Sequence, residues 1–336
     1  METRTIGNSG IEATVYALGT MPLGGGAGWG QEIEREGIDT IHAALDLGIT
    51  ILDTAEGYNA GRAEEIVGKA LVGRRDKVVV ATKISAGNTA PATLRAHCEA
   101  SLKRLQTDYI DLYQVHWPIR DESIPDAFAT LEDLKAEGKI RAIGISNHGV
   151  QDLGEVVPTG APIVSNQLHY NLVSRAIEAD IVPLCQQNGM DVIAYMPMLQ
   201  GLLVGLYDSP EQVPPFRART RHFSPSRAEA SRHGQPGAEK ELFESLRAIR
   251  GIADDLGVPM VGVALAWVAA KPFVSTVLVG SRKVSQLTAN LQAAADATAA
   301  FTPEIVAALD AATEELRVAL GNNPDYWQSG EACRSR

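Results

Sequence analysis

The chain has 336 residues, of which 45% are hydrophobic and 21% are charged, as is ordinary for a globular protein with a substantial core. Its 30 lysines and arginines against 41 aspartates and glutamates give a formal net charge of −11. This charge argues against binding to nucleic acid or to an anionic membrane through bulk electrostatics.

No segment of the sequence predicts a membrane span or an export signal. No apolar run reaches the roughly 18 residues of a membrane helix, and the opening METRTIGNSGIEATV lacks the apolar core of a signal peptide. The three cysteines, Cys98, Cys185 and Cys333, are far apart and form no C-x-x-C pair. We therefore expect no disulfide framework, no metal site and a location in a reducing cytoplasm.

Eight short apolar segments rich in β-branched residues predict eight strands. They are TVYALGT at 14–20, ITILDT at 49–54, KVVVATK at 77–83, YIDLYQVHW at 109–117, KIRAIGIS at 139–146, PIVSNQ at 162–167, MDVIAYMP at 190–197 and STVLVGS at 275–281. Ahead of them, RTIGNSGIEATV contains an Asn-Ser-Gly turn between short apolar segments, which predicts an N-terminal hairpin.

Helical periodicity fills most of the intervals between these strands. Helices are predicted at 34–48, 62–73, 93–106, 124–138, 238–257, 259–271, 283–296 and 302–320. Strands alternating with helices imply right-handed βαβ units and a parallel sheet. Eight such units in about 290 residues favour an α/β fold of the closed (β/α)8 TIM-barrel type over an open doubly wound sheet.

Two regions interrupt this repeat. Residues 200–238 form a long loop after the seventh strand, rich in proline and arginine and without a steady period. After the eighth unit come an extra C-terminal helix and an irregular tail, here taken as residues 318–336. No linker or internal repeat stands out, so we expect a single domain over residues 1–336.

The carboxyl ends of three neighbouring strands carry polar side chains, and reactive groups of a (β/α)8 barrel gather at that end. The second strand ends at Asp53, with Tyr58 five residues later in DTAEGY; the third ends at Lys83 and the fourth at His116. A lysine closing a buried strand needs a compensating charge, which Asp53 can supply. Each residue alone has an ordinary structural explanation, but the four together favour a catalytic site.

These four groups suit protonation of a carbonyl oxygen by a phenol. Free tyrosine has a pKa near ~10, and a neighbouring Lys83 ammonium is predicted to lower it. Asp53 would hold Lys83 in place, and His116 would orient the carbonyl oxygen or relay the proton. The sequence therefore predicts an acid site over a carbonyl that is converted to an alcohol.

Such a reduction needs a hydride from a cofactor, yet no G-x-G-x-x-G or P-loop fingerprint occurs, and GGGAGWG at 24–30 has the wrong spacing. The remaining strand ends offer side-chain amides, a tyrosine face and a Gly-Ser-Arg turn at 280–282. Amides suit a carboxamide, a tyrosine suits ring stacking, and such a turn before a helix suits a phosphate. A nicotinamide dinucleotide across the barrel mouth is compatible with this set, although spacing alone does not establish it.

Over nearly its whole length the sequence resembles an aldo-keto reductase. DTAEGY, ATK and VHW match the contexts of that family's catalytic tetrad, which corresponds to Asp53, Tyr58, Lys83 and His116. Further matching motifs are LGT at 18–20, GISN at 144–147, SNQ at 165–167, AYMPMLQGLL at 194–203 and GSRKVSQLTAN at 280–290. The chain is similar to the bacterial inositol-catabolism type and to the potassium-channel β subunits. The resemblance implies a (β/α)8 barrel that binds NADP(H) in an extended form without a Rossmann unit.

The resemblance also implies which residues contact the cofactor. Tyr195 would stack on the nicotinamide, and Arg282 would take the 2′-phosphate, as suits a guanidinium. Met196 stands where many members have serine, which leaves its backbone amide for the cofactor phosphates. The full implied set is Gly19, Thr20 and Met21 near the ribose, Asp53, then Ser146, Asn147 and Gln167 for the carboxamide, Tyr195, Met196, Pro197, Met198, Gln200, Gly201, Gly280, Ser281, and Arg282, Gln286 and Asn290 toward the adenosine.

Several alternatives stay open. The long loop 200–238 is either a mobile surface loop with solvated arginines or a flap over the cofactor pyrophosphate. Tyr326 and Trp327 of the tail either line the substrate pocket or pack against the barrel, and Trp117, directly after His116, is the better pocket candidate. The favoured function is NADPH-dependent reduction of a small aldehyde or ketone, with Tyr58, His116 and Trp117 at the substrate. The alternative is a redox-sensing, NADP(H)-binding regulatory subunit.

Overall fold

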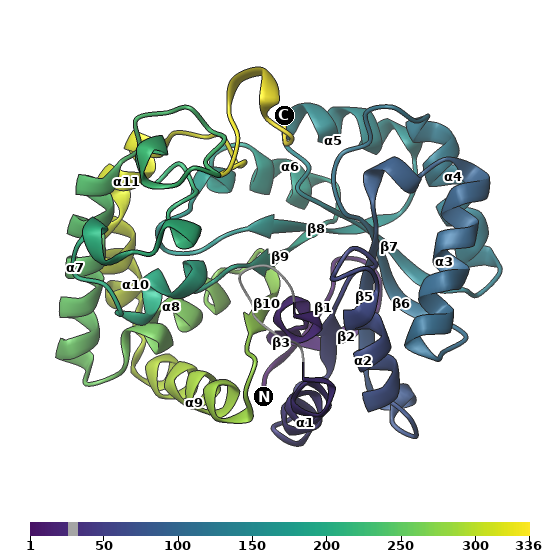
Figure 1. Ribbon diagram of the computed structural model, residues 1–336, viewed down its shortest axis with the longest axis horizontal. Helices are drawn as coiled ribbons and strands as arrows, with labels where there is room; N and C mark the ends of the chain where they lie inside the picture. The colour runs from purple at the N-terminus through teal and green to yellow at the C-terminus, as the bar shows by residue number, and fades with distance from the viewer. Residues whose placement is uncertain (26–32) are drawn as a thin grey trace.

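The computed structural model describes residues 1–25 and 33–336 and shows a closed parallel barrel ringed by helices (Figure 1). Most of GGGAGWG lies outside the described residues. The barrel strands are β3 (Tyr16–Gly19), β4 (Ile51–Asp53), β5 (Val79–Ile84), β6 (Ile110–Val115), β7 (Ile140–Ser146), β8 (Ile163–His169), β9 (Asp191–Tyr195) and β10 (Val274–Gly280). They follow one another in chain order, and β10 pairs with β3 to close the barrel. The predicted (β/α)8 barrel is confirmed.

The predicted N-terminal hairpin is also present, as β1 (Thr3–Thr5) paired antiparallel with β2 (Glu12–Thr14). Ile6 and Ile11 at its turn are buried in an inner core together with Ile51 and Leu112 from the barrel strands. The hairpin therefore packs against the inside of the barrel, and the polar side chains of the candidate site lie at the opposite, carboxyl ends of the strands.

Eleven α-helices accompany the strands in the described residues. They are α1 (Glu34–Asp46), α2 (Arg62–Ala70), α3 (Pro91–Leu105), α4 (Ile124–Ala136), α5 (Val150–Val156), α6 (Ile181–Gln187), α7 (Glu239–Leu256), α8 (Met260–Ala269), α9 (Val284–Ala300), α10 (Pro303–Ala312) and α11 (Glu314–Leu320). The sequence did not predict α5 and α6, because seven residues make fewer than two turns and show no clear period. The expected C-terminal helix 302–320 is divided at Thr313, whose backbone (φ −117°, ψ 4°) ends α10.

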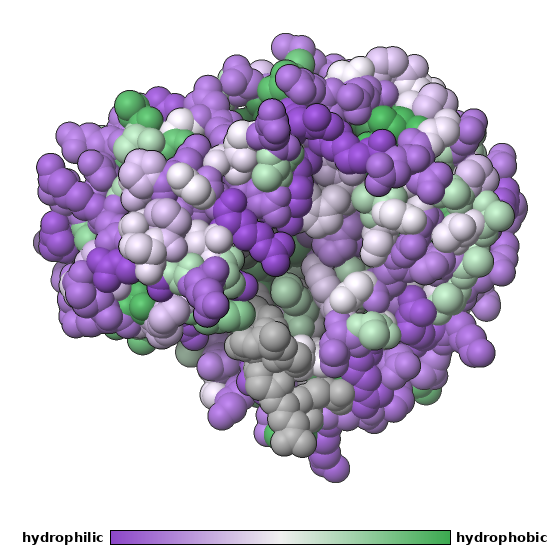
Figure 2. Space-filling view, turned by 45° about the horizontal axis from the view of Figure 1, so that its top comes forward, coloured by the Kyte–Doolittle hydropathy of each residue, from purple (hydrophilic) through white to green (hydrophobic). Residues whose placement is uncertain are grey.

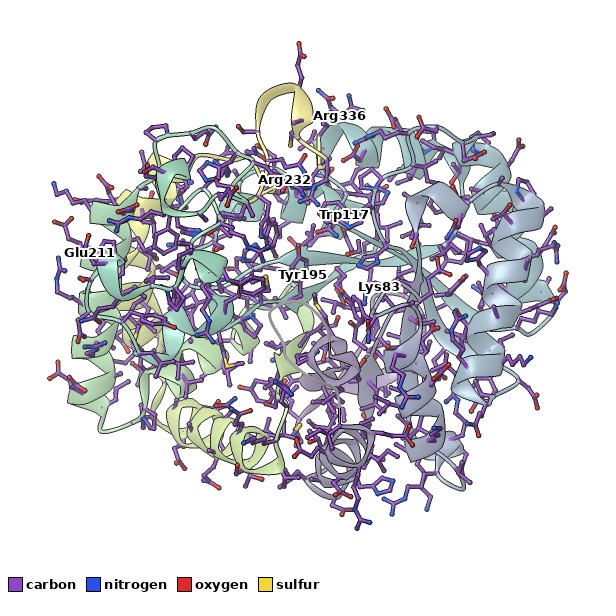
Figure 3. The ribbon with its side chains drawn as sticks, in the orientation of Figure 1. Lys83, Trp117, Tyr195, Glu211, Arg232 and Arg336 are labelled. Carbon is purple, nitrogen blue, oxygen red and sulfur yellow. The ribbon has the colours of Figure 1, made fainter. Side chains whose placement is uncertain are left out.

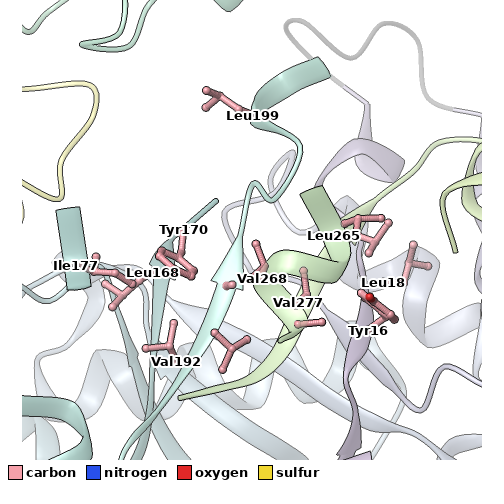
Figure 4. Close-up of a cluster of buried hydrophobic side chains, with 14 of the residues drawn as sticks. Tyr16, Leu18, Leu168, Tyr170, Ile177, Val192, Leu199, Leu265, Val268 and Val277 are labelled. Carbon is pink, nitrogen blue, oxygen red and sulfur yellow. The ribbon is translucent and has the colours of Figure 1, made fainter. Parts of the chain in front are cut away.

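A larger outer core lies between the barrel and the helices. Figure 4 shows Val277 of β10 beside Val268 of α8, a helix in which every residue is buried. Gly262 allows α8 to approach α9 closely, because a Cβ there would lie 2.2 Å from the carbonyl oxygen of Ala293. Among the described residues no single helix is long and apolar enough to cross a membrane, although α7 and α8 taken together, with a bend of 97°, meet the criteria of length and composition.

Candidate active site

The four side chains predicted to form a catalytic site converge at the carboxyl end of the barrel. Nζ of Lys83 lies 2.6 Å from Oδ1 of Asp53 and 3.3 Å from the hydroxyl oxygen of Tyr58. The rings of Tyr58 and His116 meet edge to face, with centroids 5.8 Å apart at an angle of 75°. Parallel strands place their carboxyl ends on one side of the barrel, which explains why residues from three strands meet here.

Lys83 is completely buried on β5 and is held in its charged form. Its ammonium donates hydrogen bonds to Asp53, to the carbonyl oxygen of Thr54 at 2.8 Å, and to Tyr58. Burial lowers the pKa of Lys83, but the charge of Asp53 and the contact with Tyr58 outweigh burial and raise it above its ordinary value. The buried ion pair therefore places a fixed positive charge beside the phenol.

The pKa of Tyr58 is raised, so the prediction that Lys83 lowers it below its ordinary value is wrong for this structure. Burial of the hydroxyl raises the pKa most, Lys83 opposes this increase, and Asp53 adds to it. Within the described residues, the hydroxyl has its one hydrogen bond with Lys83. Lys83 thus makes the phenol more acidic than burial alone would leave it, and the phenol keeps its proton at neutral pH.

The loop that carries Tyr58 is anchored by a second buried acid, Glu56. Its carboxylate accepts hydrogen bonds from the backbone N–H of Ser85 and from Asn88, both at 2.9 Å, and lies 2.7 Å from Nδ1 of His97. Burial raises the pKa of Glu56, but these hydrogen bonds hold the pKa below its ordinary value. The two acids of DTAEGY therefore differ in position: Asp53 holds Lys83, and Glu56 fixes the loop.

His116 is neutral and has free hydrogen-bonding capacity. Burial and the nearby Lys83 lower its pKa to about 3. Its backbone N–H donates to the carbonyl of Ile84 at 2.9 Å, whereas its ring nitrogens bond to none of the described residues. A neutral imidazole can orient a carbonyl oxygen through one N–H donor. A neutral imidazole with unbonded ring nitrogens fits the predicted orienting role, and the alternative of a proton relay stays a prediction.

Two glutamines donate hydrogen bonds to Oδ2 of Asp53, the oxygen that does not bond to Lys83. Gln167 donates from Nε2 to Oδ2 of Asp53 at 2.7 Å, and Gln114 donates to the same oxygen at 3.4 Å. Gln114, on β6, is fully buried and was missed by the sequence reasoning. Its position two residues before His116 was an available signal, because alternate residues of a strand face the same side.

The residues predicted for the carboxamide form one hydrogen-bonded group. Ser146 donates from Oγ to the carbonyl of Gln167 at 2.9 Å, and Nδ2 of Asn147 donates to the carbonyl of His116 at 3.0 Å. The hydroxyl of Tyr195 donates to Oδ1 of Asn147 at 2.7 Å. Asn147 has a left-handed backbone (φ 63°), a strained state that tends to mark functional sites. The structure thus brings these residues together beside Asp53.

The other residues predicted for the nucleotide line the barrel mouth around β3, β9 and β10. Gly19 pairs with both Asp53 and Gly280 across the adjoining strands, and Thr20 donates from Oγ1 to the carbonyl of Asp53 at 2.9 Å. Met21 is exposed.

After β9 the chain passes through Met196, Pro197, Met198, Gln200 and Gly201. Of these residues, Met196, Gln200 and Gly201 have positive φ.

Two buried polar atoms in this region have no partner among the described residues: Oγ of Ser281 and Oε1 of Gln200. Buried polar groups are normally hydrogen-bonded, so both atoms fit a polar ligand laid along this edge. At the start of α9, the backbone N–H of Arg282 donates to Oε1 of Gln286 at 3.4 Å, and Asn290 contacts the sulfur of Met198 at 3.6 Å. The hydroxyl of Ser281 and the side-chain amide of Gln200 are therefore placed to hydrogen-bond polar groups of an extended dinucleotide.

Arginine side chains anchor the long loop 200–238 to the rest of the protein. Arg221 is 2% exposed and donates to the carbonyls of Leu320, Asn323 and Asp325, and Arg227 forms ion pairs with Glu211 and Glu239. The alternative of solvated arginines is therefore wrong for Arg221, whereas the side chain of Arg227 is paired but still 30% exposed. Arg232, near the end of the loop, is exposed. In the view of Figure 3, Trp117 lies between Arg232 and Lys83.

The tail turns back over the side of the barrel on which the long loop 200–238 lies (Figure 1). Tyr326 is 1% exposed and packs between rings of the protein, which confirms the packing alternative for this residue. Trp327 is half-buried, and the guanidinium of Arg334 lies 3.9 Å from the ring centroid of Trp117. Figure 2 shows a hollow in this face, with strongly hydrophilic side chains at its upper rim and apolar ones deeper inside.

Comparisons with known proteins agree with this geometry. A model of the family described as "Aldo/keto reductase family" matches residues 17–314. The chain is 36% identical over 304 residues to aldo-keto reductase YhdN of Bacillus subtilis (strain 168), covering 86% of this chain and 87% of that protein. It is 32% identical over 342 residues to the NADH-specific methylglyoxal reductase of Escherichia coli (strain K12), covering 92% and 100%. A solved aldo-keto reductase from Klebsiella pneumoniae in complex with NADPH superposes with a TM-score of 0.71 at 28% identity, covering 100% and 99%.

Proposed function

The chain belongs to the aldo/keto reductase family, and on that premise we propose that it reduces the carbonyl of a small aldehyde or ketone to an alcohol, with NADPH as the hydride donor. The observation that carries the proposal is the contact of 3.3 Å between the Tyr58 hydroxyl and the buried Lys83 ammonium. A protonated phenol beside a fixed cation, next to a neutral His116 with free ring nitrogens, suits delivery of a proton to oxygen.

The nicotinamide cofactor, when bound, supplies the hydride that no protein side chain can provide. Ser146, Asn147 and Gln167 would hold its carboxamide, and Tyr195 would lie against its ring. The adenosine end would lie along Ser281, Arg282, Gln286 and Asn290, where Oγ of Ser281 lacks a partner among the described residues. Arg282 would take a 2′-phosphate, for which a guanidinium is well shaped.

The four site residues divide the proton chemistry among them. A ring N–H of His116 donates a hydrogen bond to the carbonyl oxygen and orients it. Tyr58 gives its hydroxyl proton to that oxygen, so the phenolic O–H bond breaks as the alcohol O–H bond forms. Lys83 stabilises the resulting phenolate, and Asp53 keeps Lys83 charged and in place. Solvent then returns a proton to Tyr58.

Small 2-oxoaldehydes are the substrate class that we place first, because a relative covered over its full length is named a methylglyoxal reductase. The half-buried Trp117 follows His116 directly and offers an apolar wall beside the reacting carbonyl. The tail residue Arg334 lies against the Trp117 ring and limits the space beyond it.

The test is to mix the purified protein with NADPH, or with NADH, and a panel of aldehydes and ketones that includes methylglyoxal. We expect NADPH to be oxidised only when a carbonyl compound is present and an alcohol to be formed. The loss of the absorbance of the reduced nicotinamide measures this oxidation. Running both coenzymes is necessary because that relative is named as NADH-specific. Binding of coenzyme without oxidation by any member of the panel would overturn the proposal and favour a redox-sensing role.

A further inference from the structure

Four rings form a column that begins at Tyr195 and continues into the tail and the long loop. Tyr195 and His169 stack with centroids 5.5 Å apart, and His169 meets Tyr326 at 4.7 Å. Tyr326 in turn stacks on His222 at 5.0 Å, with only 10° between the rings. Trp327 lies beside the column, 5.1 Å from His169. The members come from β9, β8, the tail and the loop 200–238, so the column joins four separate segments.

The orientation of His169 in this column is fixed by Asn171. Oδ1 of Asn171 accepts from the N–H of Val173 at 3.0 Å, and Nδ2 donates to the carbonyl of Met196 at 2.9 Å. These contacts fix which end of the amide carries the N–H groups. Nδ2 therefore donates to Nε2 of His169 at 3.1 Å, and the neutral ring carries its proton on Nδ1. Nδ1 has no partner among the described residues, so no other hydrogen bond there competes with this orientation.

The same amide acts on the backbone next to Tyr195. Met196 follows Tyr195 directly and has a left-handed backbone (φ 57°), which its contact with Asn171 helps to hold. Three contacts therefore fix Tyr195. Its hydroxyl bonds to Asn147, the carbonyl of the next residue, Met196, accepts from Asn171, and one face of its ring stacks on His169.

The far end of the column is equally well held. The hydroxyl of Tyr326 accepts from the N–H of Ala176 at 3.1 Å, and Nε2 of His222 lies 2.7 Å from the carbonyl of Val173. Burial lowers the pKa of His222 to about 4 and the pKa of His169 well below its ordinary value. Both imidazoles are therefore neutral at neutral pH, and the guanidinium of Arg221 lies at the far end of the column, 5.2 Å from the ring centroid of Tyr326.

We propose that His169 is a positioning residue for the nicotinamide cofactor: its ring holds Tyr195 in the plane against which the nicotinamide lies, and Tyr326 holds His169. This inference rests on the proposed function, which assigns Tyr195 as the stacking ring. It also gives the tail a role at the cofactor. Tyr326, considered from the sequence as a wall of the substrate pocket, is packed behind the cofactor ring.

The experiment measures NADPH affinity by fluorescence titration, without turnover, and separately measures kcat for carbonyl reduction at saturating NADPH. We expect His169→Ala to weaken NADPH binding about 5- to 10-fold, as the loss of a ring contact implies, and to leave kcat within about twofold. Two further variants separate the parts of the imidazole. His169→Phe keeps a ring without the acceptor for Asn171 and should bind within about twofold of the unaltered protein, whereas His169→Gln keeps an acceptor without a ring and should bind as poorly as His169→Ala.

Phe128→Leu serves as a control for general loss of stability, because Phe128 is fully buried in α4 and belongs to none of the column's contacts. It should lower the melting temperature without a change in NADPH affinity. Equal NADPH affinity of His169→Phe and His169→Gln, or unchanged affinity of His169→Ala, would overturn the role of His169. Failure of the unaltered protein to bind either NADPH or NADH would instead overturn the proposed function itself.

Discussion

Gln167 donates a hydrogen bond of 2.7 Å to Oδ2 of Asp53, whose other oxygen, Oδ1, holds Lys83 at 2.6 Å. A continuous path therefore runs from Gln167 through Asp53 and Lys83 to the hydroxyl of Tyr58. In the proposed function the first residue of this path contacts the cofactor and the last one protonates the substrate. The two halves of the reaction thus share one buried polar network, in which loss of any member is costly.

Tyr58→Phe removes the proposed proton donor and should lower kcat by at least about 10³-fold, because no other acidic hydroxyl contacts Lys83 in the described residues. NADPH affinity should change less than about twofold, since the ring remains. Steady-state kinetics and coenzyme titration measure the two effects separately. Tyr109→Phe, at a hydroxyl remote from the site, is the matched control and should be fully active. Retained turnover in Tyr58→Phe would remove the assignment of the acid.

The pH profile of kcat should be level between about pH 5 and pH 9. The proposed mechanism requires protonated Tyr58, whose raised pKa moves the loss of that proton to higher pH. Lys83 also has a raised pKa and stays charged over the same range, while His116, with a pKa of about 3, stays neutral. Activity should therefore fall only at the alkaline end. A step in kcat near pH 6.5, absent from His116→Asn, would contradict the neutral state of His116.

Gln114→Leu should lower kcat about 5- to 10-fold without a comparable change in NADPH affinity. The substitution removes one donor to Oδ2 of Asp53 and one of the two acceptors of Gln167, leaving the carboxylate less firmly placed beside Lys83. Gln114→Glu should be worse, because a second buried carboxylate beside Asp53 repels it unless protonated. Gln186→Leu, on the exposed face of α6, is the control. Equal kcat values for Gln114→Leu and the unaltered enzyme would argue that Gln167 alone fixes Asp53.

The sequence was sufficient to predict the barrel and the meeting of Asp53, Tyr58, Lys83 and His116. Both depend on where strands end, and the apolar segments mark those ends clearly. The direction of the pKa shift of Tyr58 could not be predicted from the sequence. Residue types indicate that a cation is near, but the balance between burial and charge depends on how much solvent reaches the hydroxyl.

Contacts between distant segments were equally out of reach. His169 and Tyr326 lie in different parts of the chain, and no period or spacing indicates that their rings meet. Arg221 looked like one of five loop arginines, yet it is the one whose guanidinium is buried against tail carbonyls. Such pairings depend on how the loop and the tail fold back over the barrel, which local sequence patterns do not encode.

Arg282→Ala should distinguish the two coenzymes. If Arg282 contacts a 2′-phosphate, its loss should raise the KM for NADPH about 10-fold or more and the KM for NADH less than about twofold. The ratio of the two KM values is the informative quantity, because a general disturbance of α9 would affect both coenzymes alike. The adjacent and exposed Lys283 supplies the control, Lys283→Ala, with a small effect on either. An equal rise for NADPH and NADH would place the phosphate contact elsewhere.

Arg221→Met should destabilise the protein by about 2–4 kcal/mol, because the carbonyls of Leu320, Asn323 and Asp325 lose a charged donor in a buried setting. Urea denaturation measures the loss. Arg219→Met, which gives up one hydrogen bond to the carbonyl of Phe216 and the contact with its exposed ring, should cost less than about 1 kcal/mol. Since Arg221 anchors the segment that carries Tyr326, its loss should also expose the tail to proteases and weaken NADPH binding. Stability equal to that of Arg219→Met would show that the tail is held by other contacts, such as the hydrogen bonds from Gln151 and Asp152 to Arg336.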